Sequence, residues 1–196
     1  MEKQFSAAGQ GLIKIFFGVC LSAAYVLLNT TGLVLGLMPL RVLSAIICLA
    51  AFFMVFVGLT ASSIAESGYR RAIWCARLGA VAGLLAALIV DNSILIFALA
   101  VFRQLMELAG IMIVCRLSNG LVAERDGEAD SGRGELSWRL CILCGVGGII
   151  SGCAALFFAN SKMLLASVAV YLVLQLLGRL IFMVFLYRCQ GALQGH

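Results

Sequence analysis

Charged residues are scarce in this chain. Asp, Glu, Lys and Arg make up 12% of its 196 residues, hydrophobic residues make up 63%, and the mean hydropathy is +1.11. Soluble domains carry about 25% charged and about 45–50% apolar residues. This balance excludes an ordinary soluble domain and predicts an integral membrane protein surrounded by a lipid bilayer.

Histidine and recognisable catalytic motifs are also nearly missing. The chain has one His, His196, so histidine acid–base catalysis and His-ligated zinc or haem are nearly excluded. No HExxH, GxSxG or P-loop motif is present. Glu107, a carboxylate inside an apolar run, has no second carboxylate at a useful spacing. We therefore expect no enzymatic activity and no bound cofactor.

Long apolar runs dominate what is present. A helix of about 17–25 apolar residues crosses a bilayer. We predict a single all-α membrane domain of six transmembrane helices, at about residues 12–34, 39–62, 73–90, 93–116, 138–159 and 163–188. Short breaks predict three helical hairpins, at about 12–62, 73–116 and 138–188. The longest break, at about 118–137, is acidic and glycine-rich and predicts a mobile loop.

The basic residues near the ends of these runs are unevenly distributed. Two lie on one side, Arg41 and Lys162, and ten on the other: Lys3, Lys14, Arg70, Arg71, Arg77, Arg116, Arg125, Arg133, Arg139 and Arg188. Lys and Arg collect on the cytoplasmic side of membrane proteins, so both termini are predicted to be cytoplasmic. The net charge of +5 then reflects topology and does not indicate nucleic-acid binding.

Each predicted hairpin shows the same small-residue pattern. Pairs of small residues four apart precede the outer turns, and an Asn followed by Ser or Thr lies in each turn, at Asn29, Asn92 and Asn160. Such pairs let helix backbones approach closely. The candidate helix-packing residues are Gly18, Ser22, Gly79, Gly83, Gly148 and Gly152. They indicate an internal repeat, although Gly and Asn are also simply common at such places.

Two opposite charges lie inside apolar runs, Glu107 in the fourth and Arg179 in the sixth. A charge at the centre of a membrane helix costs about 2.5–3.5 kcal/mol on insertion scales and normally has a partner or a function. Both runs are predicted to cross in the same direction. Glu107 and Arg179 lie at similar positions along them and are therefore expected at a similar depth.

Further polar residues share helix faces with this pair, because residues three or four apart on a helix are neighbours. The candidate ligand-binding or ion-pair residues are Arg103, Gln104, Glu107, Tyr171, Gln175 and Arg179. One interpretation is a polar site between the fourth and sixth helices, whose excess positive charge favours a small anionic ligand. The other is an ion pair with amide hydrogen bonds that only holds the bundle together.

The chain has eight cysteines, most of them near predicted cytoplasmic helix ends. Cys141 and Cys144 form a CxxC pair on a helix, which is a weak candidate for a redox pair or half of a metal site. The cytoplasm is reducing and free cysteine behaves as a small hydrophobe, so we expect ordinary packing and no metal.

Two function classes follow from these patterns. The first is a small transporter, channel or substrate-capture subunit with a polar site in mid-membrane. In size and topology the chain resembles the substrate-binding subunits of energy-coupling-factor importers, although it lacks their long outer loops. The second class is an accessory or assembly subunit that binds a membrane-protein partner, or a second copy of itself, through its small-residue faces and polar stripe.

Overall fold

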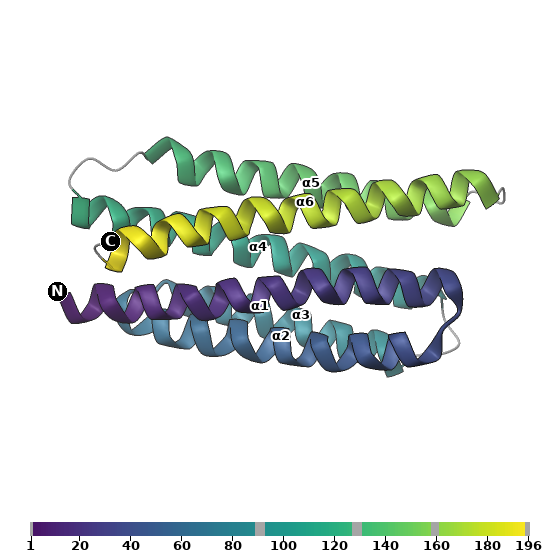
Figure 1. Ribbon diagram of the computed structural model, residues 1–196, viewed down its shortest axis with the longest axis horizontal. Helices are drawn as coiled ribbons and strands as arrows, with labels where there is room; N and C mark the ends of the chain where they lie inside the picture. Colours follow the sequence, from purple (N-terminus) through teal and green to yellow (C-terminus); the bar gives the residue numbers. More distant parts are fainter. Residues whose placement is uncertain (1, 89–92, 127–130, 158–160, 195–196) are drawn as a thin grey trace.

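Over the residues that the structure describes, the chain is a bundle of six long helices (Figure 1). The computed structural model describes residues 2–88, 93–126, 131–157 and 161–194. In chain order its helices are α1 (Glu2–Leu35), α2 (Met38–Ala65), α3 (Tyr69–Leu88), α4 (Ser93–Asp126), α5 (Ser131–Phe157) and α6 (Ser161–Gln194).

Five of these helices, all except α3, are long and apolar enough over their described residues to cross a membrane. α3 has 20 residues and carries Arg70, Arg71 and Arg77 in its first half, which leaves only a short uncharged stretch. Membrane-helix character is thus shown for five helices, and the sixth crossing stays a prediction. Large apolar side chains such as Leu49, Ile64 and Leu143 are exposed on the outside of the bundle, as expected for a surface that faces lipid.

The connection between α1 and α2 is a tight turn at Gly36. Gly36 has a φ of +66°, and the N–H of Leu37 donates to the carbonyl of Gly32 at 2.9 Å. This bond closes the end of α1 as a Schellman-type cap, where glycine avoids the strain of a left-handed conformation. Pro39 then starts α2, because its ring is compatible with the first helical turn.

The most extensive helix contacts within the described residues join α1 to α2, α5 to α6 and α3 to α4. α1 also packs along α6, and the start of α1 and the end of α6 lie at the same end of the bundle (Figure 1). α1 and α2 approach closely at two glycines, Gly11 and Gly58. A Cβ on Gly11 would lie 2.7 Å from the carbonyl oxygen of Gly58, and one on Gly58 would lie 2.6 Å from that of Gly11.

A buried core fills the half of the bundle that contains the two ends of the chain. Its members come from all of the helices and include Leu12, Tyr69, Cys115, Leu186 and Leu193. Tyr69 is fully buried, and its hydroxyl shares a hydrogen bond of 2.7 Å with that of Ser118 on α4. The start of α3 is therefore held to α4 by a buried polar contact as well as by packing.

Helix extends further than the sequence pattern predicts at two places. The expected loop at 118–137 is partly helical, because α4 continues to Asp126 and α5 begins at Ser131. Leu121 is buried within the continuation of α4, so packing stabilises helix where composition favours a loop. Asn29, expected in a turn, lies inside α1, which runs on until Gly36 can end it. Asn92 and Asn160 lie outside the described residues.

Candidate intramembrane polar site

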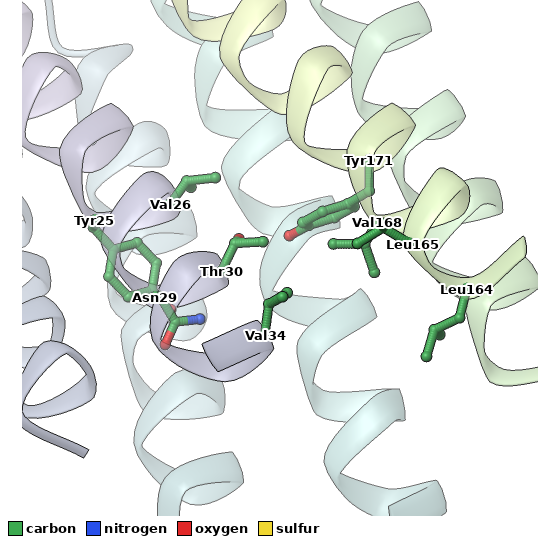
Figure 2. A pocket seen from close by; sticks show the side chains of 9 residues that line it. All are labelled: Tyr25, Val26, Asn29, Thr30, Val34, Leu164, Leu165, Val168 and Tyr171. Atoms are coloured by element: carbon green, nitrogen blue, oxygen red, sulfur yellow. The ribbon is translucent and has the colours of Figure 1, made fainter. Parts of the chain in front are cut away.

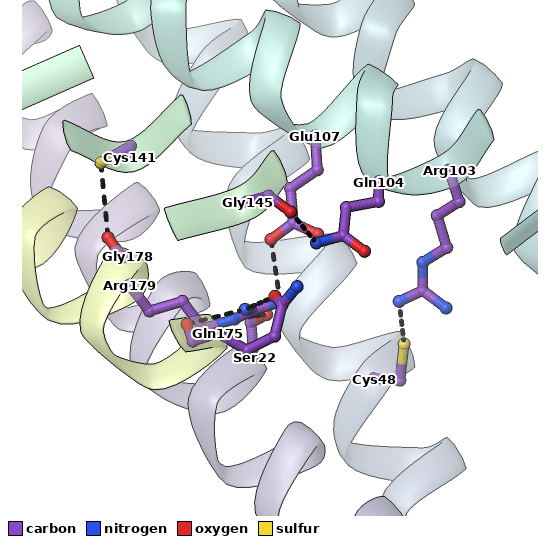
Figure 3. A network of polar contacts seen from close by, with 10 residues as sticks. All are labelled: Ser22, Cys48, Arg103, Gln104, Glu107, Cys141, Gly145, Gln175, Gly178 and Arg179. Carbon is purple, nitrogen blue, oxygen red and sulfur yellow. Dashed lines mark hydrogen bonds and ion pairs between the residues drawn. The ribbon is translucent and has the colours of Figure 1, made fainter. Parts of the chain in front are cut away.

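Arg179 on α6 is the centre of the polar contacts inside the bundle (Figure 3). Its Nε donates to Ser22 Oγ on α1 at 3.0 Å, and its Nη2 donates to Glu107 Oε1 on α4 at 3.0 Å. Its Nη1 donates to Gln175 one turn earlier, at 2.6 Å to Oε1 and 3.1 Å to the carbonyl oxygen. One guanidinium thus joins α1, α4 and α6 with four hydrogen bonds from its five N–H donors.

The two members of the ion pair differ in burial. The Arg179 side chain is 9% exposed, whereas that of Glu107 is 36% exposed. A cavity of about 20 Å³ lies beside them, between α4, α5 and α6. A space of about 10–15 Å³ is enough for one water molecule. The ion pair is therefore closely packed, with room beside it for a water molecule rather than for a larger ligand.

Two glutamines line the same small cavity. Gln104 Nε2 donates to the carbonyl of Gly145 on α5 at 3.3 Å. Gln175 is 7% exposed, and its Nε2 has no hydrogen-bond partner in the described chain. A buried donor without an acceptor is costly, so this amide marks a position where a water or a ligand atom would be stabilising.

Arg103 does not join the contacts around Arg179. Its Nη2 lies 3.3 Å from Cys48 Sγ on α2, and its guanidinium lies over the ring of Tyr25 on α1, at 5.3 Å from the ring centroid. Within the described part of the chain, no carboxylate lies within 4 Å of Arg103. The fourth helix thus directs Glu107 toward α6 and Arg103 toward α1 and α2 (Figure 3).

Tyr171, the remaining residue of the predicted stripe, lines a different and larger space (Figure 2). This space is a groove of about 480 Å³ between α1 and α6. Its walls are Tyr25, Val26, Asn29, Thr30 and Val34 from α1, and Leu164, Leu165, Val168 and Tyr171 from α6. We call it the α1–α6 groove. The six predicted residues are therefore distributed over three neighbouring sites: the contacts around Arg179, the surroundings of Arg103, and the α1–α6 groove.

The predicted helix-packing residues make two kinds of contact. A Cβ on Gly18 would lie 3.0 Å from the Ala51 carbonyl, which indicates close backbone packing of α1 on α2. Gly83 and Gly148 instead leave room for long polar side chains on the following helix. Added Cβ atoms there would lie 3.2 Å from Arg103 Nη1 and 2.8 Å from Gln175 Nε2, respectively.

The other three predicted packing residues also face neighbouring helices. Gly79 has Met106 as its nearest neighbour, at 3.6 Å from an added Cβ, and Gly152 has Tyr171, at 3.8 Å. Ser22 accepts the hydrogen bond from Arg179 Nε, so it has a polar role as well as a small size.

Three polar residues of α1 contribute more to these sites than the sequence analysis foresaw. Ser22 accepts from Arg179, Tyr25 lies against Arg103, and Asn29 lines the α1–α6 groove and accepts from Ser44 Oγ at 3.5 Å. Their spacing of three and four residues places them on one face of α1. That spacing was the signal in the sequence that could have identified them.

The cysteines make no recognisable metal or disulfide site among the described residues. All eight are free, and no group of three or more potential ligands converges there. Cys141 Sγ donates to the carbonyl of Gly178 at 3.4 Å, and Cys144 is buried beside Gly178. The CxxC pair thus lies in the contact between α5 and α6.

Comparison with known proteins adds no family: no family model, no curated protein and no solved structure matches this chain.

Proposed function

We propose that this protein spans the membrane six times, as three hairpins with cytoplasmic termini, and binds or transports a small anionic ligand within the bundle. The observation that carries the proposal is the charge balance of the interior. Arg103 and Arg179 both point into the bundle, and among the described residues Glu107 is the carboxylate that pairs with one of them, Arg179. An anion would balance the remaining positive charge.

The two arginines are unequally satisfied, and this difference suggests where the ligand binds. Arg179 has four hydrogen bonds to oxygen atoms. Among the described residues, the Arg103 guanidinium has a thiol as its hydrogen-bond acceptor and an aromatic ring beside it, which are weaker partners than a carboxylate or phosphate. We therefore assign the ligand's negative charge to the side of Arg103, with Arg179 holding α1, α4 and α6 in place.

Ligand binding to purified protein tests this proposal. The protein in detergent is heated with acetate, with succinate or with inorganic phosphate, and the midpoint of unfolding is recorded. At least one anion should raise the midpoint in the native chain. Arg103→Gln and Arg179→Ala should each abolish that rise while still unfolding cooperatively. Arg139→Gln is the matched control, because Arg139 belongs to an exposed pair with Glu135 on one helix.

The proposal fails if no tested anion changes the midpoint, or if Arg103→Gln responds as the native chain does. A second function is favoured by one observation, the four hydrogen bonds that Arg179 makes to other groups of the chain itself. An accessory subunit would use this contact only to hold its own helices. In that case a membrane protein should copurify in fixed ratio from the native membrane, and anions should have no effect.

A further inference from the structure

The α1–α6 groove changes in chemical character along its length. At the end near the α1–α2 turn its walls are apolar, with Val34, Leu164 and Leu165. At the other end lie the two phenols, Tyr25 and Tyr171 (Figure 2). Tyr25 to Val34 spans nine residues, which is about 14 Å along a helix axis. The groove thus has one apolar end and one polar end.

The polar end of the groove has unused hydrogen-bonding capacity and lies beside positive charge. Neither the Tyr25 nor the Tyr171 hydroxyl has a hydrogen-bond partner among the described residues. Arg103 lies over the Tyr25 ring, at 5.3 Å from its centroid, and Tyr171 lies within electrostatic range of Arg103 and Arg179 and of one carboxylate, Glu107.

From these features we infer the class of ligand: a single-chain amphiphile with an anionic headgroup, such as a fatty acid. Its headgroup lies at Tyr25 and Tyr171, near Arg103, and its chain lies between Val34, Leu164, Leu165 and Val168. This inference rests on the proposed anion-binding function and names the substrate class and the route by which it reaches the site, laterally between α1 and α6.

The size and wall chemistry of the groove favour this occupant over the alternatives. A volume of about 480 Å³ falls in the range of small-molecule sites, about 300–1,000 Å³. A helix from a partner protein is about 10–12 Å wide with its side chains and is too bulky for this space. A free inorganic anion has no group to contact the apolar walls, whereas an alkyl chain packs against them as well as it packs against lipid.

The experiment compares three probes on the full chain in lipid nanodiscs: palmitate, hexadecanol and inorganic phosphate. Palmitate has both tail and charge, hexadecanol has only the tail, and phosphate has only the charge. Binding of palmitate and of phosphate is measured directly with each radiolabelled compound, and hexadecanol is measured by competition with radiolabelled palmitate. Palmitate should compete at least about tenfold better than hexadecanol, which corresponds to about 1.4 kcal/mol for the charged headgroup.

Two variants that fill the groove provide the structural arm of the test. Val168→Trp and Val34→Trp should each weaken palmitate binding by about tenfold or more. Val173→Trp is the matched control, since Val173 is 61% exposed on the same helix and does not line the groove. Thermal unfolding of each variant shows whether it folds. If one groove variant fails to fold, the other is sufficient for the test.

The outcomes separate this inference from the function on which it rests. Palmitate binding lost in a groove variant and kept in Val173→Trp supports the inference. Phosphate binding that the groove variants leave unchanged, without palmitate binding, overturns the inference and keeps the proposed function. Equal competition by palmitate and hexadecanol overturns the assigned headgroup, and no binding of any probe overturns both.

Discussion

Arg179 and Glu107 are 72 positions apart in the chain, yet their side chains form an ion pair with Nη2 3.0 Å from Oε1. Each lies in the middle of an apolar helix, where an unpaired charge is costly. The pair joins α6 to α4, and the same guanidinium also bonds Ser22 on α1. It therefore links three helices through one side chain.

Breaking this pair should destabilise the bundle. Arg179→Ala leaves the Glu107 carboxylate, Ser22 Oγ and Gln175 Oε1 without their donor. We expect a loss of about 1–3 kcal/mol, the cost of leaving hydrogen-bonding groups unsatisfied, measured by denaturant unfolding in detergent. Glu107→Gln combined with Arg179→Gln should recover part of the loss, because no charge is left unpaired.

The exposed pair of Arg139 and Glu135 is the control for that measurement. Their side chains are 62% and 52% exposed, and an exposed pair contributes about 0–1 kcal/mol. Arg139→Ala should therefore change stability much less than Arg179→Ala. Equal losses for the two variants would show that the Arg179 pair is no more important than a surface contact.

Close packing of α1 on α2 predicts a large effect of a single methyl group. Gly58→Ala would place a Cβ 2.6 Å from the Gly11 carbonyl oxygen and 2.7 Å from Ile15 Cγ1. Overpacking of this kind costs about 1–3 kcal/mol. Gly120→Ala is the control, because nothing lies within 4 Å of its Cβ position and alanine favours helix. A Gly58→Ala variant as stable as Gly120→Ala would contradict the close contact.

The buried hydrogen bond between Tyr69 and Ser118 should contribute to the stability of the α3–α4 contact. Tyr69→Phe keeps the ring in the core and removes only the hydroxyl, which lies 2.7 Å from Ser118 Oγ. We expect a loss of about 0.5–1.5 kcal/mol, with a smaller loss when Ser118→Ala is added, since neither partner is then unsatisfied. Additive losses in the double variant would exclude an interaction between the two residues.

The proposed orientation predicts which turns can be labelled from outside the cell. In a cysteine-free background, Leu37→Cys in the α1–α2 turn should react with a membrane-impermeant maleimide in intact cells. Ser67→Cys in the α2–α3 turn should react only after permeabilisation, because Arg70 and Arg71 follow it and basic residues stay cytoplasmic. Both positions are exposed in the structure. The reverse pattern of labelling would show an inverted orientation.

The position of Arg103 on α4 illustrates why some features of the site could not be predicted from the sequence. The spacing of Arg103 and Glu107 predicts that they share a face of α4, but neighbours four apart can still point to different helices. Whether Arg103 meets α6 or α2 depends on how α4 is rotated in the bundle. In the structure Arg103 reaches Cys48 and Tyr25, so the predicted single site is divided.

The sequence by itself determined that the chain is built from long apolar helices, because lipid leaves no other partner for backbone polar groups. It also determined that Glu107 and Arg179 need partners, because isolated charges are costly in apolar surroundings. Only the tertiary structure decided that these two pair with each other, that α4 remains helical to Asp126, and that a groove opens between α1 and α6. These features depend on which helix faces meet, and that is set by contacts between residues far apart in the chain.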